Sequence, residues 1–222
     1  MMTELNEWES KKLLEENGIN IPKGYLAKYD GSDMINNIST ALESLELLNV
    51  NQYVIKIISP DIVHKSDVGG VTLNITSNNV ISEVYKMGSR IKNKLPEARI
   101  KGFYIQELCD PGIECIIGIK EDSQFGKVIM FGLGGIYAEI FKDISMRILP
   151  ITKEDAQEMI TETKVYKILN GYRGKHYDIE SIINTIIKIS QLADSLDIKE
   201  LDINPLVVYE KGICCLDARI RL

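Results

Sequence analysis

Residues 200–220 read ELDINPLVVYEKGICCLDARI and predict two strands joined by a turn at Lys211–Gly212. The runs LVV and ICC are rich in residue types that suit buried strands, and the glycine between them marks the turn. Pro205 has no backbone N–H, so we expect it to limit the pairing of the first strand. The chain is therefore expected to close on a β-hairpin.

The same hairpin carries a candidate metal site. Asp202 and Asn204 are two positions apart, so their side chains share a face if both lie on one strand. Asp217 lies on the returning strand, in a register that can bring it opposite the Asn204 region. An amide oxygen and a carboxylate suit Mg²⁺, which shares its remaining positions with water and phosphates. The open alternative is a turn asparagine and a strand-end aspartate that pairs with Arg219 or a neighbour.

Hydrophobic periodicity divides the rest of the chain. A capping box of Asn6 and Glu9 begins the first helix, and Gly18 is expected to end it. Further helices are predicted over 33–49, 79–95, 152–169 and 178–196, and strands over 51–58, 70–76, 98–110, 112–122, 127–135 and 136–150. A β-rich centre between helices predicts an α+β fold with two lobes and not a doubly wound sheet.

The composition narrows the classes of partner. The 222 residues are 45% hydrophobic and 26% charged, with a formal net charge of −6 and no basic block, so no nucleic acid is expected to bind. The charged first segment does not resemble a signal peptide, and no stretch reaches the ~18 apolar residues of a membrane span. We expect no membrane partner and a reducing, cytoplasmic location. Four cysteines without a CxxC pair fit this expectation: Cys109, Cys115, Cys214 and Cys215.

The glycine-rich stretch GLGGIY, residues 132–137, invites comparison with a dinucleotide-binding fingerprint. That fingerprint requires glycine or alanine in the sixth position and a helix directly after it. Here the sixth residue is Tyr137, and the residues that follow alternate like a strand. The stretch is therefore predicted to be a tight turn between strands.

Three charged residues interrupt apolar strands. Lys56 lies within VIKII, where a lysine either reaches solvent from an edge strand or points into a site that needs fixed positive charge. Glu107 lies within IQEL and Glu114 within IECII. Taken alone, each glutamate is expected on the solvent face of its strand.

One of the two histidines lies on a sharply bounded loop. Residues 59–70 read SPDIVHKSDVGG and place His64 between a proline turn and a glycine pair. A histidine near neutral pH is mostly uncharged and has a nucleophilic ring nitrogen. His64 is thus either a hydrogen-bonded loop residue or a nucleophile, whereas His176 in GYRGKHYD has no comparable setting.

Three stretches together, residues 59–71, 128–150 and 200–220, resemble a known family. It is the ATP-grasp β subunit of ADP-forming acetyl-CoA synthetase, one of the nucleoside-diphosphate-forming acyl-CoA synthetases related to succinyl-CoA synthetase. The resemblance covers essentially the whole chain, with small departures at Glu121 and Ser123. It implies an ATP-grasp fold in which two lobes close on Mg-nucleotide. Residues 23–104 would form the small lid lobe, and the opening helix (1–22) with 105–222 would form the larger lobe.

The resemblance also implies a nucleotide site. Lys56 matches a residue that binds nucleotide phosphates, and Glu114 matches one that faces the ribose or the phosphates. A hinge strand beside adenine and ribose would consist of Gln106, Glu107 and Leu108. In this family ADP and ATP are substrates.

The resemblance implies roles for four further residues, two at the metal site and two in phosphate transfer. Asn204 and Asp217 match the residues that hold Mg²⁺. His64 matches a histidine that carries the phosphoryl group, and Asp202 matches the acid that supports it. The segment around His64 would collect phosphate and deliver it to ADP.

The reaction implied is acyl-CoA + ADP + phosphate = acid + CoA + ATP, with acetate or another acyl group. The chain has no dinucleotide-type fold for CoA, so we expect a separate CoA-binding α subunit, in an α₂β₂ assembly by analogy with the family. Two alternatives stay open. One is a succinyl-CoA synthetase-like ligase subunit, and the other is a regulatory subunit that binds nucleotide without turnover.

Overall fold

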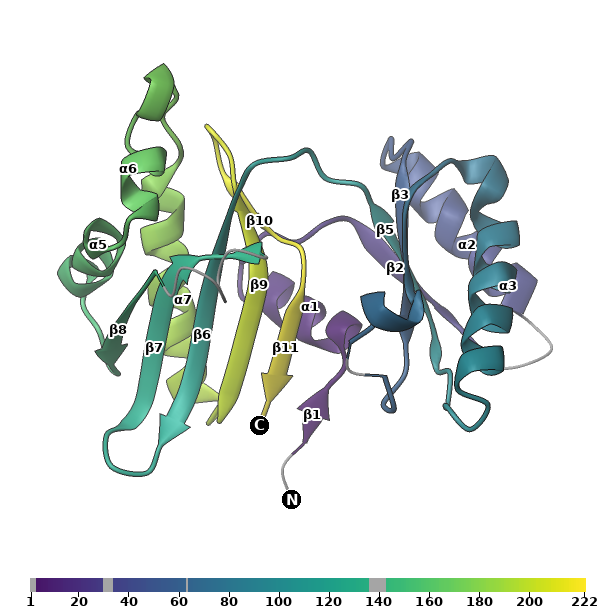
Figure 1. Ribbon diagram of the computed structural model, residues 1–222, viewed down its shortest axis with the longest axis horizontal. Coiled ribbons are helices and arrows are strands. Elements are labelled where there is room, and N and C mark those ends of the chain that lie inside the picture. The colour runs from purple at the N-terminus through teal and green to yellow at the C-terminus, as the bar shows by residue number, and fades with distance from the viewer. Residues whose placement is uncertain (1–2, 30–33, 63, 136–142) are drawn as a thin grey trace. The chain divides into compact units, whose positions relative to one another are not determined.

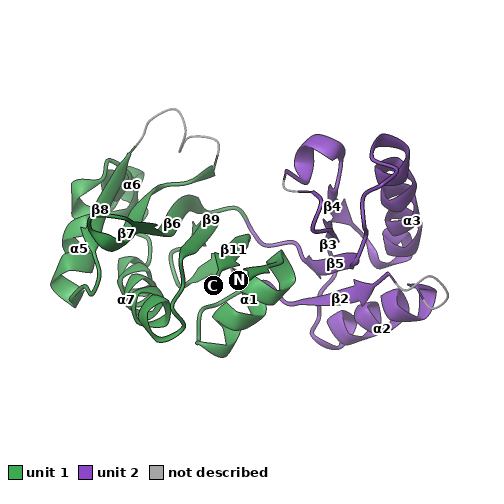
Figure 2. Ribbon diagram, turned by 90° about the horizontal axis from the view of Figure 1, so that it is seen from below, with its two compact units in different colours: residues 1–21, 111–222 green, residues 22–110 purple. Residues whose placement is uncertain are grey.

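The computed structural model describes residues 3–29, 34–62, 64–135 and 143–222, and the chain forms two compact units (Figures 1 and 2). Unit 1 combines residues 1–21 with 111–222, and unit 2 comprises residues 22–110. Residues 105–110 therefore belong to unit 2, although the predicted larger lobe began at 105. The reason is that strand β5 (Gly102–Glu107) pairs on both sides within the sheet of unit 2.

Unit 1 is built on an antiparallel seven-stranded sheet in the order β1-β11-β9-β6-β7-β8, with β10 also paired to β9. Its strands are β1 (Glu4–Leu5), β6 (Ile113–Asp122), β7 (Gly126–Leu133), β8 (Ile144–Ile148), β9 (Glu200–Val208), β10 (Ile213–Cys215) and β11 (Ala218–Arg221). Its helices are α1 (Glu7–Glu16), α5 (Lys153–Glu162), α6 (Val165–Leu169) and α7 (Ile179–Ser195), with a short 3₁₀ turn at Tyr172–Gly174. Figure 1 shows α5 and α7 against one face of the sheet.

The core of unit 1 lies between this face and the helices. Because side chains alternate along a strand, every second residue of β6, β7 and β9 points to the helices. The fully buried residues include Ile117, Ile129, Phe131 and Ile203 from the strands and Ile182, Ile186 and Ile189 from α7. The intervening residues lie on the opposite side of the sheet, which we call the open face.

The open face changes character across the sheet. At its β7–β8 end it carries partly exposed apolar side chains and a hollow of about 600 Å³, lined by Lys120, Asp122, Phe125, Val128, Met130, Met146, Arg147 and Ile148. Towards β9 and β11 the same face carries Glu114, Asp202, Asn204 and Arg219. The charged side chains of unit 1 that the sequence singles out are thus gathered on the side of the sheet that the core does not use.

Unit 2 is a four-stranded antiparallel sheet with two helices on one face (Figure 1). The order is β2-β5-β3-β4, formed by β2 (Gly24–Lys28), β5, β3 (Tyr53–Ile58) and β4 (Val71–Ile75). The helices are α2 (Met34–Leu47) and α3 (Ser77–Lys94), and a 3₁₀ turn spans Ser66–Val68. Their core includes Ile38, Leu45, Val84, Met87, Ile55, Ile57, Phe103 and Ile105.

The structure confirms the predicted start of the first helix. The Asn6 side chain accepts a hydrogen bond from the Glu9 N–H at 3.1 Å, and the Glu9 carboxylate accepts one from the Asn6 N–H at 2.9 Å. Helix α1 ends at Glu16, and Gly18 follows with a φ of +71°. The capping box and the glycine therefore bound α1 as the sequence indicated.

The helix predicted over 152–169 is wrong in one respect, because it is broken into α5 and α6. Thr163 is extended, and the carboxylate of Asp143 accepts hydrogen bonds from the N–H groups of Lys164 and Val165 at 2.7 and 2.9 Å. A carboxylate that binds free N–H groups at a helix start favours a new helix there. Of the strand predicted over 136–150, residues 136–142 lie outside the described part, and β8 covers Ile144–Ile148.

Helix α1 contains a buried ion pair. The Lys11 Nζ and Glu7 Oε1 atoms are 3.0 Å apart, one helical turn from each other, and each side chain is only 1% exposed. A charged pair is rarely buried so completely unless its members bind each other. Part of the charged surface of α1 is therefore buried.

No helix in the described ranges is long and apolar enough to cross a membrane. The four cysteines all lie within those ranges and form no disulfide bond. The Cys115 thiol is buried, and its burial raises its pKa well above the usual range.

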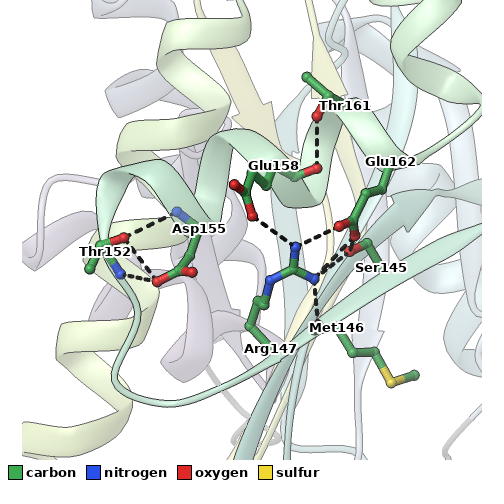
Figure 3. Close-up of polar contacts among 8 residues, drawn as sticks. All are labelled: Ser145, Met146, Arg147, Thr152, Asp155, Glu158, Thr161 and Glu162. Atoms are coloured by element: carbon green, nitrogen blue, oxygen red, sulfur yellow. Dashed lines mark hydrogen bonds and ion pairs between the residues drawn. The ribbon is translucent and has the colours of Figure 1, made fainter.

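Strand β8 is held to helix α5 by one arginine (Figure 3). The Arg147 guanidinium donates to the two carboxylate oxygens of Glu162 at 2.6 and 3.1 Å, and Glu158 lies at 3.5 Å. The Ser145 hydroxyl also donates to Glu162 at 2.5 Å. These hydrogen bonds from Arg147 and Ser145 lower the pKa of Glu162 to about 2.

We expect Arg147→Met to lower the free energy of unfolding by about 1 kcal/mol at pH 7, since the Glu162 side chain is 50% exposed. The pKa of Glu162 is lowered on folding, so its contribution is present above its ordinary value of 4.5 and is lost as the pH falls towards about 2. The difference between variant and wild type should therefore shrink over that interval in urea titrations. Lys153→Met removes an exposed pair with Glu180 and is the control. A difference that stays constant down to pH 2.5 would contradict this assignment.

Candidate functional site

Strand β9 places Asp202 and Asn204 on the open face of unit 1. Their neighbours Leu201 and Ile203 are buried in the core, so the two polar side chains point the other way. Asp202 lies directly opposite Arg219 on β11. The prediction that Asp202 and Asn204 share a face is therefore confirmed.

Asp217 is close to Asn204, but it does not lie on a strand. The Asn204 N–H donates to the carbonyl oxygen of Asp217 at 3.3 Å, and Asp217 falls between β10 and β11. The returning strand is broken here because β9 pairs with β11 up to Ile203 and with β10 from Leu206 onward. Pro205 between them lacks an N–H, as the sequence indicated.

The carboxyl of Asp202 is electrostatically coupled to its neighbours. Although the residue lies at an exposed position of β9, neighbouring groups remove enough water from the carboxyl to raise its pKa, and the negative charge of Asp217 raises it further. Arg219 acts in the opposite direction. Asp202 and Asp217 are therefore close enough to repel each other, and a cation bound between them would be stabilised.

A glycine turn after β7 touches both β6 and β9. The Gly134 N–H donates to the carbonyl oxygen of Glu114 at 2.9 Å, and the Gly135 N–H donates to Asn204 Oδ1 at 3.0 Å. Gly135 has a φ of +62°, in the left-handed region that favours glycine. Sequence reasoning predicted a turn here but missed its contacts with Glu114 and Asn204.

The donor set of this face fits Mg²⁺ better than a closed metal site. Within the described ranges, no three His, Cys, Asp or Glu side chains are grouped so as to hold a metal ion. Asn204 and Asp217 together offer an amide oxygen and a carboxylate, both partly exposed. Mg²⁺ commonly takes one or two protein ligands and completes its shell with water and phosphate oxygens.

In unit 2, Lys56 lies on an inner strand. Strand β3 pairs with β5 on one side and β4 on the other, with Lys56 opposite Tyr104 and Val71. Lys56 is only 7% exposed. The alternative that Lys56 reaches solvent from an edge strand is therefore wrong.

Gln106 shares a face of this sheet with Lys56. Gln106 pairs with Val54, two residues before Lys56, so both side chains point away from α2 and α3. Gln106 is 3% exposed. A lysine and a glutamine on a buried sheet face supply the fixed charge and the hydrogen-bonding groups that a polar ligand needs.

Glu107 ends strand β5 and Leu108 follows it, and both bind neighbouring segments. The Glu107 carboxylate accepts a hydrogen bond from the Lys23 N–H at 2.7 Å, and the Glu107 N–H donates to the Lys23 carbonyl at 2.8 Å. The Leu108 N–H donates to the carbonyl of Gln52 at 2.9 Å. Glu107 therefore binds protein backbone here.

The loop that carries His64 is anchored on both sides. Asp61 binds Arg99 at 2.7 Å and also accepts from the Arg99 N–H at 2.8 Å, and the hydrogen bonds from Arg99 lower the pKa of Asp61 to about 2. On the other side, the Gly70 N–H donates to Lys65 and the Gly70 carbonyl accepts from Ile57. The His64 side chain between these anchors is exposed.

The structure thus gathers the predicted residues in two groups, each described within its own unit. Unit 1 brings together Glu114, Asp202, Asn204 and Asp217. Unit 2 carries Lys56, Gln106, Glu107 and Leu108 on or beside the inner strands, and His64 on its loop. Asp202 and its predicted partner His64 belong to different units.

The family profile of the ATP-grasp domain matches residues 1–222. The match covers both units of the α+β structure, and the chain belongs to the ATP-grasp domain family. Its homologues include ADP-forming acetate–CoA ligases. It is 42% identical to subunit beta of acetate–CoA ligase [ADP-forming] II from Pyrococcus furiosus, over 99% of this chain and 92% of that one.

Other relatives carry the same domain within a longer polypeptide. Acetate–CoA ligase [ADP-forming] I from Archaeoglobus fulgidus is 46% identical over 76% of this chain, which spans 25% of that protein. Among solved structures, acetyl-coenzyme A synthetase 1 from Ca. Korarchaeum cryptofilum, in complex with coenzyme A and Ca-AMPCP, has a TM-score of 0.88 and 39% identity, covering 99% of this chain and 93% of that one. A second structure of that enzyme, with coenzyme A and Mg-AMPPCP, has a TM-score of 0.79 and 37% identity over 99% and 92% of the two chains. Its phosphohistidine segment is described as pointing towards the nucleotide-binding site.

The coupling between Asp202 and its neighbours can be tested by titration. We expect Asp217→Asn to move the pKa of Asp202 down towards its ordinary value of 3.8, because a like charge is removed. Arg219→Met should move the pKa of Asp202 up, because an opposite charge is lost. The carboxyl ¹³C shifts of labelled aspartates, followed by NMR, measure both changes. Equal pKa values of Asp202 in the three proteins would contradict the proximity inferred here.

Proposed function

We propose that this chain is the nucleotide-binding β subunit of an ADP-forming acetate–CoA or other acyl–CoA ligase. It takes phosphate onto His64 and delivers it to ADP, so that acyl-CoA, ADP and phosphate give acid, CoA and ATP. One observation carries most of the proposal: an exposed imidazole on a loop anchored at both ends, in a chain 42% identical over 99% of its length to such a β subunit.

The chemistry asked of His64 is a pair of phosphoryl transfers. In the first, a ring nitrogen forms a bond to phosphorus while the bond from phosphorus to the donor oxygen breaks. In the second, a terminal oxygen of ADP bonds to phosphorus, and the ring nitrogen keeps the electron pair of the broken N–P bond. An exposed imidazole suits both steps, because its ring nitrogen is a nucleophile and a leaving group.

The other predicted residues bind and orient the nucleotide. Lys56 offers a fixed positive charge for phosphate oxygens, while Gln106, Glu107 and Leu108 form the hinge strand beside adenine and ribose. Glu114 faces the ribose or the phosphates. Phosphoryl transfer depends mainly on alignment and charge neutralisation, so positioning residues of this kind carry much of the catalysis.

Mg²⁺ fits the open face of unit 1. Asn204 and Asp217 would hold it, and when bound it supplies positive charge that neutralises the phosphate oxygens during transfer. Asp202 would then stabilise the positively charged ring of phosphorylated His64. The amide oxygen of Asn204 beside the carboxylate of Asp217, and the Mg-AMPPCP complex of a related enzyme, support this assignment.

The chain is proposed to act with a CoA-binding α subunit in an α₂β₂ assembly. The Pyrococcus furiosus relative is a separate β subunit, and the Archaeoglobus fulgidus relative contains the corresponding domain as a quarter of a longer chain. Both arrangements are consistent with a CoA-binding part outside this domain. The proposal includes no nucleic acid and no membrane as partners, and it places the enzyme in the cytoplasm.

His64→Ala should abolish labelling of the chain by [γ-³²P]ATP and should abolish ATP formation with the α subunit. The matched control is His176→Ala, because His176 is the other of the two histidines and is also exposed. That variant should label like the wild type. ADP binding by the His64 variant, measured by calorimetry, should stay nearly unchanged, since the nucleotide contacts proposed above come from other residues. Full labelling of His64→Ala would rule out the phosphate carrier, and ADP binding without any label on the wild type would favour a regulatory subunit.

Lys56→Met should lower kcat/KM for ATP formation by a factor that corresponds to about 2.7–4 kcal/mol, as for other single donors to a transition state. Methionine keeps most of the length of the side chain and removes its charge and its N–H donors. The control, Lys101→Met, removes a charge at an exposed position of the same unit and should leave kcat/KM nearly unchanged. Thermal unfolding of both variants separates lost catalysis from lost stability. If Lys56→Met retains more than half of the wild-type kcat/KM, the role given to Lys56 is wrong.

A further inference from the structure

The glycine run Gly132–Gly135 is the one sequence motif that the proposed function leaves without a role. Its first two residues end β7, and its last residue precedes residue 136, where the described part stops. Two of its N–H groups bind residues assigned to the site: Gly134 binds the Glu114 backbone, and Gly135 binds the Asn204 side chain. The turn therefore contacts both a proposed nucleotide residue and a proposed metal ligand.

The bond to Asn204 decides which way its carboxamide faces. A backbone N–H can donate only to an acceptor, so the Gly135 N–H selects the orientation in which Oδ1 points to it, at 3.0 Å. The reversed orientation would place two N–H groups face to face. A carbonyl oxygen has two lone pairs, so Oδ1 keeps acceptor capacity for a cation.

The missing side chain of Gly135 matters independently of this bond. A Cβ atom at position 135 would overlap the carboxylate oxygen Oε2 of Glu114, and the φ of +62° disfavours any side chain as well. Gly134 is confined in a similar way, because its Cβ would overlap the backbone of Cys115. The turn is thus packed directly against Glu114: a side chain at Gly135 would displace the Glu114 carboxylate, and one at Gly134 would meet the Cys115 backbone.

Other glycines show what a turn alone requires. Gly126, Gly174 and Gly212 have φ values of +76°, +80° and +79°, and a Cβ at any of them would meet no atom within 4 Å. The positive φ alone is enough to account for a glycine at these three positions. Gly135 has a similar conformation, but it also has a polar contact and a steric contact with site residues, which a turn does not need.

We propose that Gly135 is a positioning residue for the Mg-nucleotide site. Its N–H holds the Asn204 carboxamide oxygen in the orientation that binds a cation, and its lack of a side chain leaves the Glu114 carboxylate in place. The inference rests on the proposed function, because it concerns the same site. It adds a residue that acts through Asn204 and Glu114 without touching the nucleotide.

The decisive comparison is Gly135→Ala with Gly126→Ala in the full chain. Both changes put a side chain on a glycine of positive φ, so both should lower the melting temperature. Only Gly135→Ala should weaken ADP binding in the presence of Mg²⁺, by about tenfold or more, as other changes behind metal ligands do. In EDTA the contribution of Asn204 is absent, so Gly135→Ala should lose less ADP binding than it does with Mg²⁺, with the remaining loss due to the displaced Glu114 carboxylate, and Gly126→Ala should stay within about twofold. Calorimetric titrations with ADP, with and without Mg²⁺, provide these readouts.

A second pair of variants covers the case in which Gly135→Ala does not fold. Asn204→Asp retains an oxygen facing Gly135 whichever way the group is turned, so it should keep most of the Mg²⁺ dependence. Asn204→Leu has no acceptor and should lose it. In ¹⁵N spectra the Gly135 amide proton should move upfield in Asn204→Leu and much less in Asn204→Asp.

The outcomes separate the two proposals. If the wild type binds ADP with no effect of Mg²⁺, the proposed function is wrong and the inference is lost with it. If the wild type depends on Mg²⁺ and Gly135→Ala behaves like Gly126→Ala, only the role of Gly135 is wrong. An unchanged Gly135 amide shift in Asn204→Leu would also overturn it.

Discussion

The interruption of the hydrogen-bond ladder along β9 determines where the polar residues of unit 1 lie. Strand β9 pairs with β6 along one side, and on the other side it passes from β11 to β10 at Asn204–Pro205. Pro205 has no N–H to continue the ladder. The segment opposite it, Leu216 and Asp217 between β10 and β11, lies outside the strands. The backbone bonds that remain, from Asn204 to Asp217 and from Leu216 to Pro205, bring an amide and a carboxylate side by side.

In both units, one face of the sheet packs against the helices and the other face carries the residues assigned to the site. Alternation along a strand gives one face to the helices, and apolar residues of β3, β5, β6, β7 and β9 fill it. The other face is then available for residues that would be costly in a core: Lys56 and Gln106 in unit 2, and Glu114, Asp202 and Asn204 in unit 1. The rigid sheets fix the direction of these side chains, which loops alone would not do.

Much of this arrangement follows from local sequence rules. The capping box at Asn6, the shared face of Asp202 and Asn204, and the effect of Pro205 each depend on residues a few positions apart. The family resemblance rests on longer motifs and indicated the ATP-grasp fold that the comparisons support. By contrast, the break between α5 and α6 depends on Asp143, more than 20 positions before the N–H groups it binds. The bond from Gly135 to Asn204 spans 69 positions and depends on the order of the strands, which no local pattern contains.

The buried pair of Glu7 and Lys11 constrains how α1 can change during evolution. Loss of either member would remove this ion pair while the other charge stays buried, which destabilises the fold by up to about 3–5 kcal/mol, whereas joint replacement by apolar residues is often tolerated. Substitutions at the two positions are therefore expected to occur together. In a saturation library of this helix, single changes at either position should be depleted, and matched apolar doubles should reappear among the survivors.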